Sequence, residues 1–304
     1  SKQCMIRVSD PKAPAVFGKS GTFEILQPEI VIVHTPITEA RENDKITFTA
    51  DVTGAGDLVV ELKYDVTGRR QFDKTKTMTK GAGSTWSCTL DVGVFTAEGI
   101  EYTIVARDPN NVGLRATSPD QGYYNIRAQV QAMTSPNKVL AGSVQNAYRM
   151  ISIPLQLTKT AITDQLERTP DGQMGTDWRL FRFSPGEDSP GEFPNIEGFS
   201  PGIAFWLIAK KDFQLKTPEG VAVSTSEPFT ITLKPGWNDI ANPWMFSISW
   251  NDIENPSSAN ISKPYSYEGG WSNPSAGPVV LKSWTGYAVR NMESVRASDE
   301  VVAF

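Results

Sequence analysis

The 304-residue chain is predicted to fold almost entirely into β-structure, on two observations. First, its 24 glycines and 21 prolines interrupt the chain about every seven residues, a density that breaks helices and favours short strands joined by turns. Second, apolar and polar residues alternate with a period of two in many short segments, as in strands with one buried face. Helix is expected only as short turns near 161–167 and 250–253, each after a Thr or Ser cap.

The length suggests two or three domains, and the middle of the chain predicts a two-sheet β-sandwich over 27–129. In the clearest strand, Ile46, Phe48 and Ala50 alternate with polar residues, so one face of that strand is apolar. The seven strands predicted for this domain cover residues 30–33, 45–52, 58–64, 72–78, 85–90, 99–107 and 123–126.

The last part of the chain, 130–304, is predicted to be a duplicated β domain with copies at about 148–226 and 227–304. The turn and apolar strand at 199–209 return in weaker form at 281–290, and Phe205 corresponds to Tyr287. Pro154 corresponds in the same way to Pro243. The features follow the same order in both copies, and a period near 85 residues is too long for a solenoid. We therefore expect one pseudo-symmetric all-β domain whose halves superpose.

Two segments resemble immunoglobulin-like (Ig-like) or fibronectin-like modules of large secreted bacterial proteins. The segment GIEYTIVARDPNNVG, at 99–113, resembles the penultimate strand and following hairpin of such a module, with Tyr102 where a tyrosine-corner residue sits. IRVSD at 6–10 and SGTFEI at 20–25 look like the last two strands of another module. The resemblance implies that 1–26 is a hairpin-like end of a preceding module, packed on or beside the sandwich, and that the chain is a piece of a longer protein.

The duplicated part resembles a repeat near the C-termini of large extracellular proteins of Bacteroidetes-like bacteria. The residues that carry this likeness are ISIP at 151–154, WRLFRF at 178–183, FSPGIAFWLI at 199–208 and GWNDIANPW at 236–244. The resemblance implies a non-catalytic structural or adhesive segment, extracellular or at the cell surface. Its expected partners are other domains of the same chain, surface polysaccharide or other surface proteins.

Composition argues against several other functions. The net charge of −5 is spread out without a basic block, so nucleic-acid binding is not expected. No apolar run approaches the length of a membrane span. One histidine, His34, and two cysteines, Cys4 and Cys88, cannot supply a closed zinc site, and no phosphate-binding glycine loop precedes a helix. No catalytic residue and no cofactor is therefore predicted; whether the two cysteines pair is left open.

One weak metal candidate is the segment Asp108, Asn110 and Asn111, whose oxygens could bind calcium. The alternative is a plain hairpin turn, because Asp-Pro-Asn-Asn consists of turn formers. A loop at 184–192 carries three carboxylates in a Gly/Pro-rich context and is expected to be solvated rather than catalytic.

The tryptophans raise an alternative function, since seven of the eight follow residue 170. Trp271 and Trp284 are the candidate ligand-contact aromatics, whereas Trp206 lies in an apolar strand and is expected in the core. An exposed aromatic row flanked by amides or carboxylates would favour a carbohydrate-binding accessory region of a secreted enzyme. Buried aromatics in modules stacked end to end would favour the hypothesis of a structural or adhesive segment.

Overall fold

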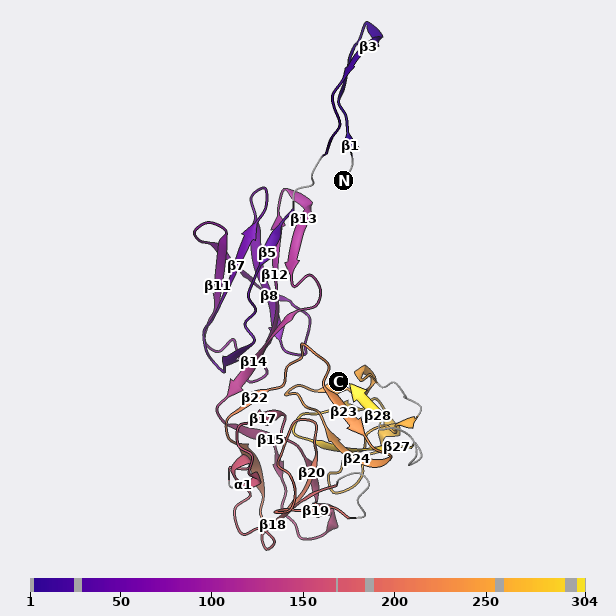
Figure 1. Ribbon diagram of the computed structural model, residues 1–304. Coiled ribbons are helices and arrows are strands. Elements are labelled where there is room, and N and C mark those ends of the chain that lie inside the picture. The colour runs from indigo at the N-terminus through magenta and orange to yellow at the C-terminus, as the bar shows by residue number, and fades with distance from the viewer. Residues whose placement is uncertain are drawn as a thin grey trace.

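The computed structural model describes residues 3–24, 29–167, 169–183, 189–254, 260–292 and 300–303. An N-terminal hairpin, a β-sandwich and a second β domain follow one another along the molecule (Figure 1). In the described residues, the helical segments are α1 (Ile162–Gln165) and the 3-10 turns η1 (Gln145–Ala147), η2 (Trp250–Asp252) and η4 (Pro274–Ala276). α1 and η2 lie where the sequence predicts short helical turns, and the all-β prediction is confirmed.

The N-terminal hairpin stands away from the rest of the molecule (Figure 1). β2 (Arg7–Asp10) pairs with β3 (Ala13–Lys19), and β1 (Gln3–Cys4) pairs with β4 (Phe23–Glu24), all antiparallel. The hairpin itself agrees with the sequence, but the expectation that it packs on or beside the sandwich is wrong. Its apolar side chains, including Val8 and Phe17, are exposed. Cys88 is a free thiol, buried in the distant sandwich.

The next segment forms an Ig-like sandwich of two sheets. One sheet has the order β10 (Thr79–Lys80), β11 (Thr85–Leu90), β7 (Ile46–Thr53) and β5 (Val31–Val33). The other contains β9 (Lys74–Thr77), β8 (Val59–Val66), β12 (Ile100–Asp108) and β14 (Tyr124–Val130), with β13 (Asn111–Ser118) on β12 and β6 (Glu39–Arg41) parallel to β14. Ile46, Phe48, Ala50 and Val52 of β7 are all buried, as their alternation predicts.

Tyr102 anchors the segment between β5 and β6 to the sandwich core. Its ring is fully buried, and its hydroxyl accepts the backbone N–H of Ile37 at 3.1 Å. The same hydroxyl lies 2.8 Å from Nε2 of His34, whose Nδ1 lies 2.7 Å from the carbonyl oxygen of Thr49. Since that carbonyl can only accept, Nδ1 donates to it and Nε2 accepts from the tyrosine. Burial lowers the pKa of His34, which therefore serves as a structural neutral residue.

The second domain consists of small sheets arranged around a shared core. Its main sheet has the order β16 (Arg149–Ile151), β20 (Phe205–Ala209), β18 (Trp178–Arg182) and β19 (Gly191–Glu192). The paired strands beside it are β24 (Gly236–Ala241) with β27 (Gly286–Asn291), β15 (Met133–Val139) with β21 (Phe213–Thr217), β23 (Thr230–Leu233) with β28 (Glu300–Ala303), and β25 (Ile248–Ser249) with β26 (Val280–Leu281).

Strand register relates the two halves of this domain. In the first copy, Ile151 of β16 lies opposite Phe205 of β20; in the second, Ile240 of β24 lies opposite Tyr287 of β27. These pairs are equivalent in the alignment that matches Pro154 with Pro243 and Phe205 with Tyr287. The third strand agrees as well, since Phe181 faces Trp206 and Tyr265 faces Ala288.

The two copies also hold each other by reciprocal backbone hydrogen bonds. Ser152 N–H donates to the Trp284 carbonyl at 3.2 Å, and the equivalent Ala241 N–H donates to the Gly202 carbonyl at 2.9 Å. Gly202 and Trp284 both have positive φ, 82° and 64°, so the same turn conformation recurs in both copies. Each half thus donates one backbone hydrogen bond to the equivalent turn of the other.

The sandwich and the duplicated domain share a continuous sheet and a buried polar junction. β14 runs out of the sandwich and pairs with β22 (Gly220–Ala222), which pairs with β17 (Leu155–Leu157). Beside it, the Thr225 hydroxyl donates to Glu101 Oε1 at 2.7 Å, and Tyr123 donates to the Thr225 carbonyl at 3.0 Å. The Glu101 side chain is fully buried, and burial raises its pKa. These contacts fix the orientation of the two bodies.

Candidate functional site: an aromatic groove

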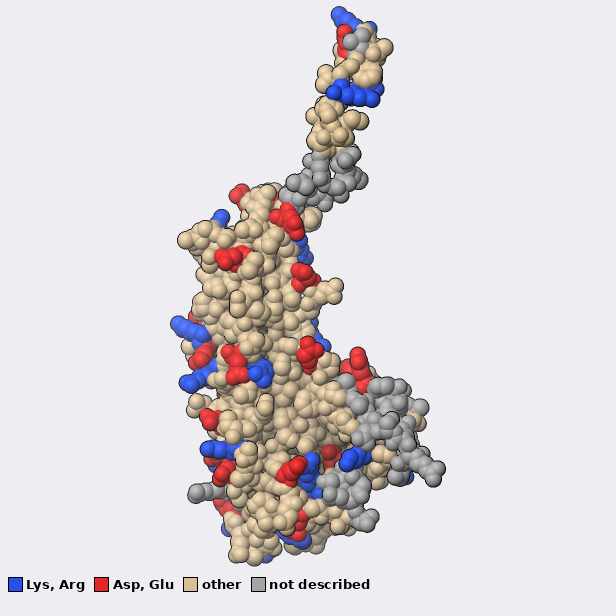
Figure 2. Space-filling model, in the orientation of Figure 1, with Lys and Arg blue, Asp and Glu red and all other residues tan. Residues whose placement is uncertain are grey.

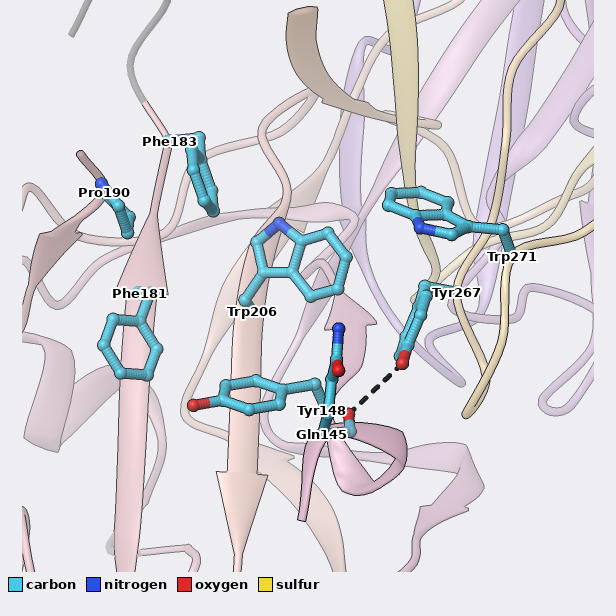
Figure 3. A pocket seen from close by; sticks show the side chains of 8 residues that line it. All are labelled: Gln145, Tyr148, Phe181, Phe183, Pro190, Trp206, Tyr267 and Trp271. Carbon is cyan, nitrogen blue, oxygen red and sulfur yellow. Dashed lines mark hydrogen bonds between the residues drawn. The ribbon is translucent and has the colours of Figure 1, made fainter. Parts of the chain in front are cut away.

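A surface depression built mainly from aromatic side chains lies between the two copies of the duplicated domain. It encloses about 340 Å³ and is open to solvent (Figure 3). Its aromatic walls are formed by Tyr148, Phe181, Phe183, Trp206, Tyr267 and Trp271. Gln145 and Pro190 complete the lining. We call this depression the aromatic groove.

The first copy supplies one wall through the alternation of its strands. On β20, Phe205 and Leu207 are fully buried, so Trp206 between them points to the opposite face. On β18, Trp178 and Leu180 are buried, and Phe181 lies opposite Trp206 in register. The expectation that Trp206 is a core residue is therefore wrong. It is only partly buried and stands in the middle of the groove (Figure 3).

The second copy supplies the other wall from a short turn. Tyr267 and Trp271 form a β-bridge, which places both rings beside Trp206. The Trp206 ring centroid lies 5.3 Å from that of Tyr267 and 5.6 Å from that of Trp271. The Tyr267 hydroxyl donates to the Gln145 carbonyl at 3.2 Å, drawn as the dashed line in Figure 3. This bond joins the second copy to the segment that precedes the first.

Polar groups at the groove fall into two kinds. One is already used: the Trp206 indole N–H donates to Oδ2 of Asp239 at 2.7 Å, and burial raises the pKa of that carboxyl to about 7. The others are the Gln145 amide, the Tyr148 hydroxyl and the Trp271 indole N–H, which make no hydrogen bond to any residue that the structure describes. These groups remain available to a ligand beside apolar ring faces.

The two tryptophans singled out by the sequence lie in different environments. Trp271 is 54% exposed and lines the groove, whereas Trp284 is 5% exposed and belongs to the main core cluster. Trp284 therefore does not line the aromatic groove, and its role as a ligand contact stays a prediction. Trp284 has a positive φ, and its carbonyl accepts the Ser152 N–H, so its segment lies in the interface between the copies.

The calcium candidate Asp108, Asn110 and Asn111 lies at a hairpin of the sandwich, outside the lining of the groove. Asp108 and Asn111 pair at the end of the β12–β13 hairpin, and Asp108 Oδ1 accepts the Asn110 N–H at 2.8 Å. This arrangement is an Asx turn, which agrees with the plain hairpin turn that the sequence offers as the alternative to a calcium site. Among the described residues, no group of three or more His, Cys, Asp or Glu is placed to hold a metal ion.

Of the loop at 184–192, Glu187 and Asp188 lie outside the described residues. Glu192 makes a bidentate ion pair with Arg179, at 2.7 and 2.8 Å. On the face drawn in Figure 2, acidic and basic side chains are interspersed, without a gathered basic patch. Within the described part of the chain, no helix is long and apolar enough to cross a membrane.

Comparison with protein-family models and with curated proteins found no match. Solved structures similar to this chain include titin domains I67–I69 in an E-to-A mutated variant, at 11% identity and a TM-score of 0.27, covering 92% of this chain and 95% of that one. Others are titin domains z1z2 in complex with telethonin (13%, 0.25, covering 72% and 91%) and a marsupial T cell receptor (12%, 0.27, covering 92% and 93%). Scores this low carry over neither ligand nor partner.

Proposed function

We propose that this chain is a non-catalytic adhesive segment of a larger secreted or cell-surface bacterial protein, and that it binds polysaccharide in the aromatic groove. The observation that supports the proposal is the groove itself: partly exposed aromatic rings stand beside an amide, a hydroxyl and an indole N–H without described partners. The proposed organisation is a preceding-module hairpin at 1–26, an Ig-like spacer at 27–129 and the duplicated binding domain at 130–304.

The groove has the chemistry that a sugar ring requires. A pyranose presents an apolar C–H face and a rim of hydroxyl groups. The C–H face gains contact and loses water when it lies on an aromatic ring, here Trp206 or Trp271. The hydroxyl rim exchanges hydrogen bonds with the Gln145 amide and the Tyr148 hydroxyl, which fix its orientation. A purely apolar ligand would leave these polar groups without partners.

The sandwich has a supporting role in this proposal. The sheet that continues from β12 through β14 and β22 to β17 makes the junction stiff, and the buried bond between Thr225 and Glu101 reinforces it. A stiff spacer holds the groove at a fixed distance from the preceding module. A flexible linker in the same position would let the groove fold back against its own protein.

Affinity electrophoresis through gels that contain soluble polysaccharides of different sugar composition tests the proposal. The wild-type chain is expected to be retarded by at least one of them, and Trp271→Ala to weaken that binding at least about tenfold. Phe17→Ala removes an exposed aromatic ring from the N-terminal hairpin and serves as the matched control, which should bind like the wild type. No retardation in any gel, or equal retardation of Trp271→Ala, would contradict the proposal.

A further inference from the structure

The aromatic groove is one part of a longer row of rings that crosses from one copy to the other. From Trp206, the row runs to Phe183 on one side, at 6.3 Å between ring centroids, and to Trp271 on the other, at 5.6 Å. Trp271 leads to Tyr265 at 6.4 Å, and Tyr265 leads to Trp237 at 5.8 Å. Tyr265 and Trp237 lie outside the lining of the groove, so the row is longer than the groove.

Both ends of the row are open to solvent. Phe183 is 44% exposed and Trp237 is 54% exposed. A site for the end of a sugar chain has to close over the terminal ring in order to recognise it. Here a ligand that lies along the row can continue past either end, which suits internal units of a chain.

The rings are steeply tilted rather than coplanar. The planes of successive rings meet at 69°, 75°, 90° and 73° along the row from Phe183 to Trp237. The flat face of a crystalline polysaccharide would need a platform of coplanar rings to contact them all. A single chain in solution can rotate each sugar about its glycosidic bonds and so meet rings that face different directions.

We infer that the row is an extended site for a single, soluble polysaccharide chain bound through its internal units, with Trp237 at an outer subsite in the second copy. The inference rests on the proposed function and adds the form and length of the ligand. Duplication of the domain explains how such a site arises: the first copy contributes Phe183 and Trp206, and the second contributes Trp271, Tyr265 and Trp237.

Calorimetric titration with oligosaccharides of increasing length tests the inference. The probes are cello-, laminari- and galacturono-oligosaccharides from the disaccharide to the hexasaccharide, with crystalline cellulose as the insoluble comparison. For a series that binds, affinity is expected to rise at least about tenfold from disaccharide to hexasaccharide. Trp237→Ala should weaken hexasaccharide binding several-fold more than disaccharide binding, while Phe17→Ala changes neither. Crystalline cellulose should not deplete the protein from solution.

Trp237→Phe keeps a ring at the outer subsite, and its affinity is expected between those of the wild type and Trp237→Ala. Unfolding temperatures of all variants establish that each one is folded. Three results would overturn the inference: equal affinity for all lengths, an unaltered length dependence in Trp237→Ala, or depletion of the protein by crystalline cellulose. If Trp271→Ala still weakens binding in that case, the proposed function stands. If no sugar binds and Trp271→Ala changes nothing, the proposed function fails, and the inference fails with it.

Discussion

The indole N–H of Trp206 donates a 2.7 Å hydrogen bond to the carboxyl group of Asp239, and the two residues belong to different copies of the duplicated domain. Trp206 stands in the middle of the aromatic groove, so this bond fixes the ring on which the proposed ligand lies. The same bond connects the groove to β24, a strand of the second copy. One carboxyl group therefore contributes both to the contact between the copies and to the position of the Trp206 ring.

Asp239→Asn is expected to change the pH dependence of stability. Burial raises the pKa of Asp239 from 3.8 to about 7, so the folded protein binds this proton more tightly than the unfolded chain. The resulting stabilisation is complete below about pH 4 and is lost as pH rises through about 7. Asparagine still accepts from Trp206 and carries no charge. We expect Asp239→Asn to gain about 3–4 kcal/mol on the wild type between pH 4 and pH 8, because the rise of the Asp239 pKa from 3.8 to about 7 corresponds to that difference.

Urea unfolding at a series of pH values measures this difference. Asp171→Asn, at an exposed aspartate, is the control and should run parallel to the wild type. A constant difference between Asp239→Asn and the wild type across that pH range would show that the carboxyl titrates normally.

Gly286→Ala is expected to separate the two copies slightly. A Cβ at Gly286 would lie 2.6 Å from Cβ of Ala204 and 3.0 Å from Cβ of Met150, so backbone must move to accept it. Such overpacking costs about 1–3 kcal/mol. Gly277→Ala is the matched control, because its added Cβ meets nothing within 4 Å. Thermal unfolding should show a lower midpoint for Gly286→Ala alone; equal midpoints would argue against a close contact between the copies.

Tyr102→Phe is expected to destabilise the sandwich by about 1–3 kcal/mol, because it leaves the Ile37 N–H and Nε2 of His34 without their partner. The ring stays in place, so packing is kept. Tyr64→Phe, whose hydroxyl makes no described hydrogen bond, serves as the control. Chemical unfolding measures both. Equal stability of the two variants would mean that the hydroxyl of Tyr102 contributes nothing beyond its ring.

Thr225→Val is expected to weaken the junction between the sandwich and the duplicated domain. It removes the hydrogen bond to Oε1 of Glu101, whose Oε2 forms a long ion pair with Arg70 at 3.7 Å. Leaving the buried Oε1 without its donor costs about 1–3 kcal/mol, and Glu101→Gln in the same chain should recover part of it. Calorimetry is expected to show one unfolding transition for the wild type and a split or broadened transition for Thr225→Val. Thr77→Val, at an exposed site on β9, is the control. An unchanged transition would assign the coupling to the continuous sheet alone.

Local pattern predicted much of the fold. The alternation of Ile46, Phe48 and Ala50 fixes which face of β7 is buried, and the paired prolines at 154 and 243 mark equivalent strands. The resemblance implies a hairpin after residue 107, but alternation alone does not predict β13, because Asn111–Ser118 has little apolar alternation and becomes a strand by pairing with β12. Tertiary pairing decided that segment rather than its own propensity.

The groove was harder to predict than the fold. Trp206 lies in an apolar run, which predicts a core position, although its position between buried Phe205 and Leu207 places it on the other face. That signal was present in the sequence. The meeting of Trp206 with Tyr267 and Trp271 has no local signal, because it depends on how the two copies pack together. For the same reason, the burial of Trp284 could not be read from its own segment.

Tryptophan oxidation tests whether a polysaccharide chain occupies the aromatic groove. N-bromosuccinimide oxidises exposed indoles, and peptide mass spectrometry resolves each site. The ligand is a polysaccharide that retards the chain in affinity electrophoresis, added at a concentration that saturates binding. Trp271 and Trp237 are each 54% exposed, and their oxidation is expected to slow at least about tenfold. Unchanged oxidation of both tryptophans under saturating polysaccharide would show that the ligand does not occupy the groove.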